Sequence, residues 1–471
     1  MMYATINPAT GEQLAVFAEQ SAEEAAAIVG AVADAFASWR ETSFEERGAL
    51  LRRVAALLRQ RKTEYATLIT TEMGKPIVEA EAEIEKCAWN CEWYADNAAR
   101  LLADEPAESS ATESYVEFVP LGPVFAIMPW NFPFWQVFRF AAPALMAGNT
   151  ALLKHAPNVP QCALAIEAVF RDAGLPANCF RTLFVSNEVA ATVIADPRVR
   201  AVTLTGSDRA GSAVAAAAGQ ALKKTVLELG GSDPFIVLAD ADLDRTVAMA
   251  VRARFQNSGQ SCIAAKRFLV HEAVVDDFVE RLIAAVKELQ VGDPLNRATQ
   301  VGPLARADLR DNLHRQVVES IRQGARLVVG GEPLPGRGYF YAPTVLADVR
   351  PEMPVFQEET FGPVVALMRV ASAEEAVQLA NASAYGLGAS LWTRDIDLAR
   401  RLARTIEAGS VFINGIVASD PRLPFGGVKR SGYGRELSSY GIREFVNVQT
   451  VWIGPDRTAP QAALELARAV E

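Results

Sequence analysis

Two kinds of hydrophobic spacing divide the chain. Over the first hundred residues the apolar positions are typical of helices, and Ser21-Ala22-Glu23-Glu24 and Ser43-Phe44-Glu45-Glu46 each match a capping box ahead of an Ala/Leu-rich run. From Leu121 onward, short apolar runs alternate with amphipathic stretches. The pattern predicts a helical beginning followed by alternating strands and helices.

The alternation falls into two sets, separated by Gly230-Gly231. The first set predicts strands at 122–128, 149–154, 199–205 and 224–228, and helices at 134–147, 160–173 and 207–219. The second set predicts strands near 234–238, 266–270, 363–369, 387–392 and 410–414, and helices near 241–256, 273–289, 372–381 and 395–406. Such alternation is typical of parallel sheets covered on both faces, so we expect an α/β fold with two lobes.

Several segments stand outside both sets. Residues 112–119 and 444–452 carry strand-forming types, and as exposed edges they could be covered by pairing between subunits. Residues 292–338, with repeated Gly and Pro, are expected to form a surface excursion. The Ala-rich tail, 458–471, is expected to be a frayed helix without a functional signal.

The composition is that of a large, acidic globular chain. A length of 471 residues suits two or three domains. Lys and Arg number 46 against 56 Asp and Glu, and the resulting pI near 5.2 disfavours nucleic-acid binding. The start, Met1–Pro8, shows no signal peptide, and apolar runs such as 119–130 are too short to span a bilayer. We expect a cytoplasmic protein without a membrane partner.

The cysteines indicate neither a disulfide scaffold nor a metal centre. Cys87 and Cys91 have a helical i, i+4 spacing, but no second Cys or His pair stands nearby to complete a zinc site. Like Cys162 and Cys179, they lie in or beside helix-like, core-like sequence, which is typical of buried thiols. No metal site is expected.

Cys262 has a different setting. It follows Asn257-Ser258-Gly259-Gln260-Ser261, a stretch suited to a loop in close contact with another group. A nucleophilic cysteine is usually activated by a neighbouring His or by a lowered pKa. His155, His271 and His314 show no papain-type or caspase-type signature, so protease chemistry is disfavoured.

Three short motifs follow predicted strands of the first set. Asn131 lies in the stiff turn Pro129-Trp130-Asn131-Phe132-Pro133, either as an oxyanion donor or as a buried turn residue. Thr205-Gly206-Ser207 precedes a helix whose N-terminus would suit a phosphate, although most such turns are connectors. Glu228, before Leu229-Gly230-Gly231, could be a general base in the ligand crevice or part of a salt bridge.

Two later motifs are ambiguous when taken singly. Glu358-Glu359-Thr360-Phe361-Gly362-Pro363 is an acidic pair before an aromatic residue, a pattern most often found in solvated loops. The Gly-rich stretch 424–432 is as readily a structural loop as a functional one.

The order and spacing of these motifs resemble the aldehyde dehydrogenase superfamily. The resemblance runs from Asn7-Pro8-Ala9-Thr10-Gly11 to about Trp452, and it includes Lys154 in Leu152-Leu153-Lys154-His155-Ala156-Pro157. Within the superfamily, the continuation to Asn158-Val159 is similar to a subgroup of bacterial succinate-semialdehyde dehydrogenases.

The resemblance implies an enzyme that oxidises an aldehyde to its acid. Cys262 matches the nucleophile that forms a thiohemiacetal, and Asn131, with the backbone N–H of Cys262, matches the oxyanion hole. Hydride transfer to a nicotinamide leaves a thioester, and Glu228 matches the base that activates water to hydrolyse it.

The resemblance also implies a dinucleotide site. The positions that match cofactor contacts are Trp130, Lys154, Gly206, Ser207, Leu229, Glu359 and Phe361. Pro157 is a departure, since many NAD-preferring relatives carry Glu there. Because a carboxylate would repel a 2′-phosphate, its absence permits either NAD or NADP.

For the substrate, Arg139 and Ser419 match positions that hold the far carboxylate of a semialdehyde, although Arg139 could be purely structural. At a position where some semialdehyde dehydrogenases carry an Arg, this chain has Gln256, which leaves open how long a semialdehyde it prefers. Succinate semialdehyde is the expected substrate, and glutarate semialdehyde or a neutral aldehyde is the alternative. Glu228 disfavours a CoA-acylating enzyme, and a catalytically silent protein on this fold is the alternative of another class.

The resemblance implies two Rossmann-like lobes and a small β element for oligomerisation. The expected division is a dinucleotide-binding domain (1–101 and 121–231), a catalytic domain (232–434), an oligomerisation element (102–120 and 435–457) and a tail (458–471). A homodimer or homotetramer is expected.

Overall fold

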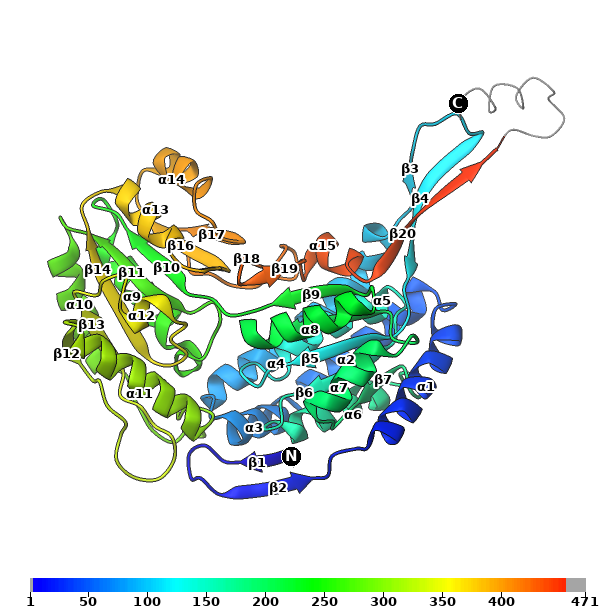
Figure 1. The fold of residues 1–471 in the computed structure, drawn as a ribbon, viewed down its shortest axis with the longest axis horizontal. Coiled ribbons are helices and arrows are strands. Elements are labelled where there is room, and N and C mark those ends of the chain that lie inside the picture. The colour runs from blue at the N-terminus through cyan, green and yellow to red at the C-terminus, as the bar shows by residue number, and fades with distance from the viewer. Residues whose placement is uncertain (1–2, 455–471) are drawn as a thin grey trace.

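The structure, a computed structural model, describes residues 3–454 and consists of two sheet-based lobes and a projecting β arm (Figure 1). The sheets contain parallel strands with helices packed around them, so the predicted α/β class with two lobes is confirmed. No helix among the described residues is long and apolar enough to cross a membrane. The predicted tail helix at 458–471 lies outside the described residues.

The first lobe is built on a six-stranded sheet with the order β19-β9-β8-β5-β6-β7. Its strands are β5 (Val124–Met128), β6 (Ala151–His155), β7 (Phe180–Thr182), β8 (Ala201–Thr205), β9 (Lys224–Glu228) and β19 (Gly432–Tyr433). All neighbours are parallel except β19, which runs antiparallel to β9. The chain leaves β5 toward β6 on one side and later returns to β8 on the other, so the strand order reverses at β5.

Helices surround this sheet and account for the helical pattern of the first hundred residues. They are α1 (Ala22–Trp39), α2 (Phe44–Gln60), α3 (Lys62–Met73), α4 (Ile77–Leu101), α5 (Trp135–Met146), α6 (Pro160–Asp172), α7 (Asn187–Ala195) and α8 (Asp208–Gln220). Ser21 and Ser43 form the predicted capping boxes. The pattern missed the hairpin of β1 (Tyr3–Ile6) and β2 (Gln13–Phe17), because both strands are short.

The second lobe contains a seven-stranded sheet with the order β12-β13-β14-β11-β10-β16-β17. Its strands are β10 (Asp233–Val237), β11 (Ala265–His271), β12 (Arg326–Val329), β13 (Thr344–Ala347), β14 (Val364–Val370), β16 (Gly388–Trp392) and β17 (Ser410–Ile413). Its helices are α9 (Leu243–Phe255), α10 (Val275–Lys287), α11 (Ala307–Arg322), α12 (Pro354–Gln357), α13 (Ala373–Asn381) and α14 (Ile396–Ala403). Only β12 pairs antiparallel.

The expectation of a surface excursion at 292–338 is wrong for its middle part. This stretch contains helix α11 and edge strand β12. Helix α11 buries only Leu313, Gln316, Val317 and Ser320, two of which are polar. The helix is amphipathic but strongly polar overall, and the repeated Gly and Pro residues on either side of it suggested a loop.

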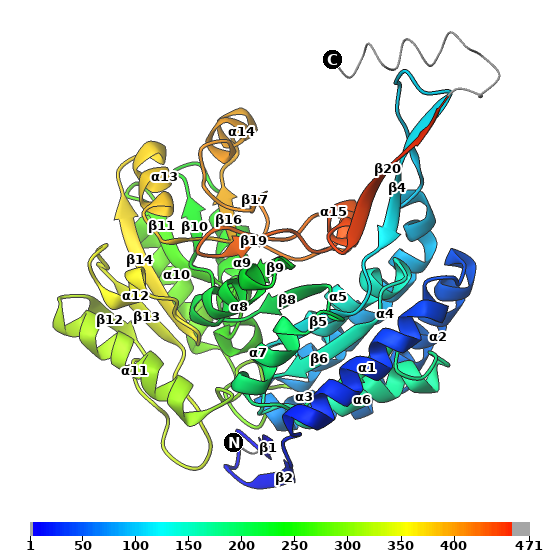
Figure 2. The same cartoon turned by 45° about the vertical axis from the view of Figure 1, so that its right-hand side comes forward.

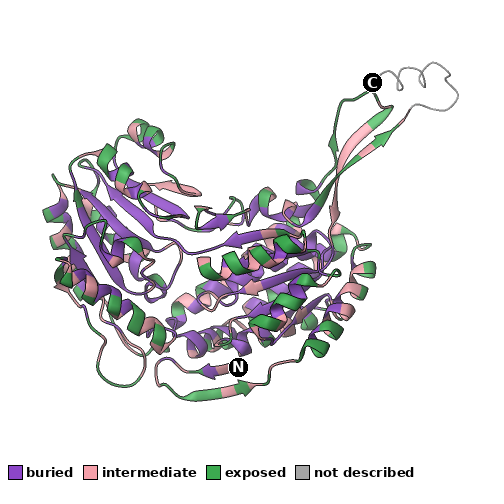
Figure 3. Ribbon diagram, in the orientation of Figure 1, coloured by how far each residue is buried: buried purple, intermediate pink, exposed green. Residues whose placement is uncertain are grey.

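Burial follows the layers of the fold (Figure 3). Strands β5, β6 and β8 are apolar and almost entirely buried, as expected for parallel strands covered on both faces. The outer faces of the surrounding helices are exposed (Figure 3). The carboxyl ends of these central strands, where ligands bind in such sheets, are therefore fixed by the packing of the core.

The arm is a three-stranded antiparallel sheet with the order β20-β4-β3. It comprises β3 (Glu105–Pro106), β4 (Glu113–Pro120) and β20 (Val446–Ile453), and it stands clear of both lobes (Figure 2). The strands predicted at 112–119 and 444–452 are confirmed. After β17 the chain forms β18 (Val428–Lys429), which pairs with β15 (Tyr385–Gly386) just before β16, and then β19, α15 (Ser438–Arg443) and β20.

Candidate active site

Sequence-predicted site residues of the first lobe lie along one edge of its sheet. Trp130 follows β5, Lys154 is near the end of β6, Ser207 follows β8 and Leu229 follows β9. These strands are parallel neighbours, and Thr205 of β8 is in register with Glu228 of β9. The carboxyl ends of β5 and β8 flank the point of reversed strand order, which is the usual ligand crevice of an open α/β sheet.

The start of α8 suits a pyrophosphate at this crevice. Ser207 caps the helix, and its hydroxyl accepts a hydrogen bond of 3.2 Å from the N–H of Ala210. The free N–H groups of a helix N-terminus attract anions. A Cβ at Gly211 would lie 2.6 Å from Leu229 Cδ1, so glycine allows the helix to pack closely on the loop after β9. The residues present therefore fit the pyrophosphate of a dinucleotide.

Gly230 and Gly231 bring the two lobes together. The N–H of Gly231 donates to Glu359 Oε1 at 3.0 Å, and a Cβ on this glycine would overlap the carbonyl oxygen of Cys262. A Cβ on Gly230 would lie 2.6 Å from Glu359 Oε2. The two glycines thus allow Glu359 and the loop of Cys262 to approach the end of β9 closely.

An aromatic contact joins the lobes beside these glycines. The rings of Trp130 and Phe361 meet edge to face, with centroids 5.6 Å apart and an interplanar angle of 84°. Both residues are half-buried, which leaves part of each ring open to a ligand.

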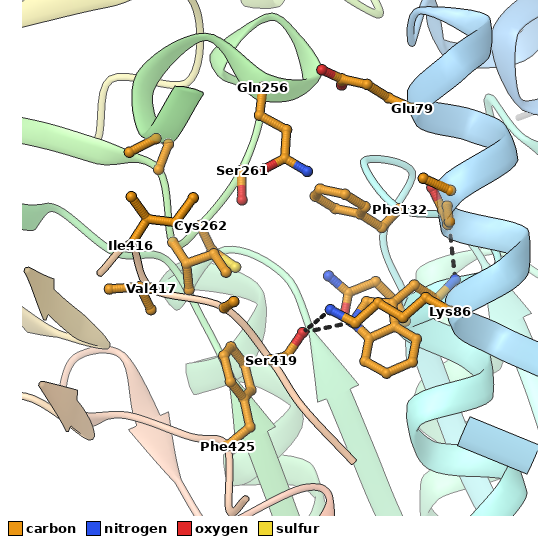
Figure 4. Close-up of a pocket in the computed structure, with 18 of the residues that line it drawn as sticks. Glu79, Lys86, Phe132, Gln256, Ser261, Cys262, Ile416, Val417, Ser419 and Phe425 are labelled. Carbon is orange, nitrogen blue, oxygen red and sulfur yellow. Dashed lines mark hydrogen bonds between the residues drawn. The ribbon is translucent and has the colours of Figure 1, made fainter. Parts of the chain in front are cut away.

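A cavity of about 260 Å³ opens beside the loop of Cys262 (Figure 4). Its walls come from α4, α5, the end of α9, residues 261–264 and residues 416–419. Of the predicted site residues, those that line it are Cys262, Arg139, Gln256 and Ser419. Asn131 and Glu228 are not among the lining residues.

The loop before Cys262 is fixed in an unusual conformation. Asn257, Ser258 and Gly259 have φ values of 54°, 55° and 74°. A Cβ at position 259 would overlap the carbonyl oxygen of Gly362, so only glycine fits there. Such conformations persist where surrounding contacts enforce them. Ser258 Oγ accepts from the N–H of Gly302 at 2.9 Å, which provides one of those contacts.

Asn131 is tied to the same loop. Its side chain is buried, and Nδ2 donates to the carbonyl oxygen of Gln260 at 3.3 Å. Its own carbonyl oxygen accepts from Asn257 Nδ2 at 2.8 Å. The structure therefore brings Asn131 next to the loop that carries Cys262.

Lys266, which the sequence reasoning missed, holds this loop from inside. Its Nζ donates to the carbonyl oxygens of Cys262 at 2.7 Å and Ser261 at 2.9 Å, and it lies 3.3 Å from Glu359 Oε1. Burial raises the pKa of the Cys262 thiol to about 12, and the cations of Arg139 and Lys266 oppose that rise. Cys262 is half-buried, whereas the other four cysteines are buried free thiols.

Glu228 lies in a buried charge cluster behind the cavity. Burial and the nearby Glu436 carboxylate raise its pKa well above the usual range, and the Arg139 cation opposes this effect. A Cβ at Gly426 would lie 2.7 Å from Glu228 Oε1, which places the carboxylate next to the residue after Phe425, a cavity residue.

Arg139 belongs to that cluster while also lining the cavity. Its guanidinium forms an ion pair with Glu436 and lies 4.7 Å from the centroid of the Phe425 ring. Nη2 is 3.4 Å from Thr205 Oγ1. The structure thus gives Arg139 a carboxylate partner that the sequence reasoning did not foresee.

A second cation lines the cavity from α4. Lys86 Nζ donates to Ser419 Oγ at 2.8 Å, and Trp135 Nε1 lies 3.1 Å from the same oxygen. The sequence contained a signal for this residue: Glu79, Ala82, Glu83 and Lys86 line the cavity at the spacing of one helix face. Their charges are typical of a solvated face, so the pattern was not distinctive.

Across residues 3–454, no group of three or more His, Cys, Asp or Glu side chains is placed to hold a metal ion.

Comparison with known proteins gives consistent matches. The model of the aldehyde dehydrogenase family matches residues 1–451. The chain is 53% identical to a probable NADP⁺ succinate-semialdehyde dehydrogenase of Synechocystis sp., covering 96% of this chain and 100% of the relative. It is 52% identical to an Escherichia coli K12 succinate semialdehyde dehydrogenase named for NAD(P)⁺, covering 95% and 97%.

The solved structures agree with these matches. Succinic semialdehyde dehydrogenase from Streptococcus pyogenes, in complex with NADP⁺, superposes with a TM-score of 0.94 at 39% identity, covering 96% of this chain and 100% of that one. The Burkholderia pseudomallei succinate-semialdehyde dehydrogenase gives a TM-score of 0.94 at 38% identity, covering 97% and 95%.

Proposed function

The chain belongs to the aldehyde dehydrogenase family, and we propose that it oxidises succinate semialdehyde, or a closely related short anionic aldehyde, to the carboxylic acid. The observation that carries this proposal is a half-buried Cys262 that faces a cavity with Lys86 and Arg139 in its wall. A volume of about 260 Å³ is below the roughly 300–1,000 Å³ of drug-sized sites, which favours a small substrate. The names of the relatives support the same substrate.

In this proposal Cys262 Sγ forms a bond to the aldehyde carbon, giving a thiohemiacetal. Asn131 Nδ2 and the backbone N–H of Cys262 donate to the oxygen that becomes negative. The contact between Asn131 Nδ2 and the Gln260 carbonyl, at 3.3 Å, holds the amide beside the loop in advance. The cations of Arg139 and Lys266 favour the thiolate, against the effect of burial.

A bound nicotinamide dinucleotide would supply the acceptor for the hydride of the thiohemiacetal carbon, and the residues that would hold it lie mostly along the sheet edge. We assign the pyrophosphate to Gly206, Ser207 and the start of α8, and the riboses to Lys154 and Glu359. We assign backbone contacts to Trp130 and Leu229, and a place beside the nicotinamide to Phe361. The edge of the sheet on which most of these residues lie supports the assignment.

We propose that Glu228 then takes a proton from water that attacks the thioester carbonyl. A carboxylate with a raised pKa is a stronger base than a free one, which suits this task. The products are the carboxylic acid and the regenerated Cys262 thiol.

We propose that the enzyme can use either NAD or NADP. Pro157 is exposed, offers no carboxylate to repel a 2′-phosphate, and follows Lys154 by three residues. The relatives named for NADP⁺ or NAD(P)⁺ support the use of NADP.

A kinetic matrix tests the proposal. Succinate semialdehyde, glutarate semialdehyde and butanal would each be tried with NAD and with NADP, following reduced nicotinamide. The proposal predicts the highest kcat/KM for succinate semialdehyde and a free acid as product, with or without CoA. A higher kcat/KM for butanal would contradict the substrate, and the absence of reduced nicotinamide with every aldehyde would favour a catalytically silent protein.

We also propose the expected domain division and a homodimer or homotetramer, joined through the arm. Val448, Trp452 and Ile453 of β20 are 62%, 42% and 45% exposed, which is unfavourable for an isolated strand. Light scattering of the purified protein would test the assembly. The five free cysteines support a reducing compartment such as the cytoplasm.

A further inference from the structure

The cavity has two buried or half-buried cations near its reactive cysteine, and they differ in what they already bind. Arg139 is ion-paired with Glu436, and both side chains are almost wholly buried. That carboxylate neutralises much of the charge that Arg139 could offer to a substrate. Lys86 has no such partner among residues 3–454: Ser419 Oγ accepts its hydrogen bond, and the Trp135 ring lies beneath it, 4.4 Å from Nζ.

The carboxylates nearest to Lys86 are already engaged. Glu83 is ion-paired with Lys75, and its Oε1 accepts the N–H groups of Phe134 and Trp135 at 2.9 Å each. Asp420 pairs with Arg422 at 2.7 Å. Desolvation of an unpaired ammonium group in a cavity wall costs free energy, and a bound anion would offset that cost.

We propose that Lys86, together with the hydroxyl of Ser419, binds the distal carboxylate of the substrate and so selects anionic over neutral aldehydes. This rests on the proposed function and names the cation that gives that site its specificity. Arg139 is then a positioning residue: it forms the ion pair with Glu436 and opposes the rise in the pKa of Glu228.

These groups lie on facing walls of one cavity. Lys86 reaches into the cavity from α4, opposite the loop that carries Cys262 (Figure 4). Ser419 Oγ accepts from both Lys86 Nζ and Trp135 Nε1, so its own hydroxyl hydrogen can turn toward a carboxylate. A ligand with an aldehyde at one end and a carboxylate at the other would meet Cys262 and Lys86 respectively.

The charge of Lys86 also depends on pH. Burial and the Arg139 cation lower its pKa to about 8, and Cys87, Asp420 and Glu83 partly oppose this shift. Lys86 is therefore mostly charged at neutral pH and loses its charge as pH rises past that value. A carboxylate in the cavity would stabilise the charged form.

The test compares succinate semialdehyde with butanal, a neutral aldehyde of the same carbon number, in three variants. Lys86→Met should lower the ratio of kcat/KM for succinate semialdehyde to kcat/KM for butanal about 100-fold, mainly through KM, which corresponds to about 2.8 kcal/mol. Lys86→Arg should restore much of that ratio. Lys287→Met is the matched control, because Lys287 is an exposed lysine on α10 that does not line the cavity.

The pH profile is an independent readout. In the wild type, the ratio of kcat/KM for succinate semialdehyde to kcat/KM for butanal should fall above about pH 8, because Lys86 loses its charge there. Titration of Cys262 and Glu228 affects both substrates alike and cancels in this ratio. In Lys86→Met, the ratio should be flat across that range.

The outcomes separate this inference from the proposed function. If the wild type prefers succinate semialdehyde and Lys86→Met keeps that preference, Lys86 does not bind the carboxylate, although the proposed function stands. If the wild type shows no preference for succinate semialdehyde, the proposed function fails first. A preference that is lost in Arg139→Leu and kept in Lys86→Met would assign the carboxylate to Arg139.

Discussion

Arg139 of α5 and Glu436, two residues before α15, form an ion pair whose side chains are only 2% and 4% exposed. Glu228 lies in the same cluster, and the Arg139 cation opposes the rise of its pKa. Arg139 therefore connects the cavity wall to the charge state of the carboxylate that we propose as the base.

Replacing Arg139 by Leu should harm stability and both aldehyde reactions. The change leaves Glu436 buried without its cation, which costs about 3–5 kcal/mol in comparable pairs. We expect the free energy of unfolding, measured by urea titration, to fall by that amount, and kcat to fall for succinate semialdehyde and for butanal alike.

A surface pair supplies the control for that prediction. Arg52 and Asp96 lie 2.6 Å apart with half or more of each side chain exposed, so Arg52→Leu should cost less than about 1 kcal/mol. An unchanged stability of Arg139→Leu, with loss of the succinate semialdehyde reaction alone, would show that Arg139 serves the substrate.

Gly259 should be essential for the shape of the nucleophile loop. At φ +74°, a Cβ would be strained and would overlap the carbonyl oxygen of Gly362. We expect Gly259→Ala to lose at least about 2 kcal/mol of stability. The shift of the loop should also lower kcat at least about 10-fold, since small displacements of reacting groups are costly.

The matched substitution is Gly219→Ala in α8, where a Cβ would meet nothing within 4 Å. It should retain kcat and keep or slightly increase stability, by up to about 1 kcal/mol. If Gly259→Ala behaved like Gly219→Ala in both assays, the loop would not be held as the structure shows.

Pro157 should influence the choice between the two dinucleotides. Pro157→Glu introduces a carboxylate near the proposed place of the 2′-phosphate, so we expect kcat/KM with NADP to fall about 10–100-fold relative to NAD. The backbone contact at this position, a 3.1 Å bond from the Ala4 N–H to the Pro157 carbonyl oxygen, does not depend on the side chain. Pro157→Gln, without the charge, should change the ratio little. If the ratio of kcat/KM with NADP to kcat/KM with NAD were the same in Pro157→Glu as in Pro157→Gln, the 2′-phosphate would have to lie elsewhere.

The sequence predicted the parts of the fold that are set by local pattern. Capping boxes at Ser21 and Ser43 mark real helix starts, and the apolar runs of β5, β6 and β8 are buried parallel strands. Helix α11 was missed because it is strongly polar overall and lies among repeated Gly and Pro residues, although its apolar positions have helical spacing.

The site was predictable only in part. Motifs at strand ends identified most of the residues along the sheet edge, because the carboxyl ends of parallel strands converge. Lys86 and Glu436 were missed, since each acts through a partner distant in sequence. Lys266 bonds to carbonyl oxygens only four and five residues away, but a single lysine in a strand carries no distinctive signal. Ser419 lies 333 residues from Lys86, and no local pattern links them.

The central claim is that Cys262 carries the substrate as a covalent thioester. The most direct measurement uses Glu228→Gln, which should slow hydrolysis, mixed with succinate semialdehyde and NADP and then quenched in acid. Mass spectrometry should find one succinyl group on the peptide that contains Cys262, and none in Cys262→Ala. A succinyl group on another residue, or rapid turnover by Cys262→Ala, would contradict the account.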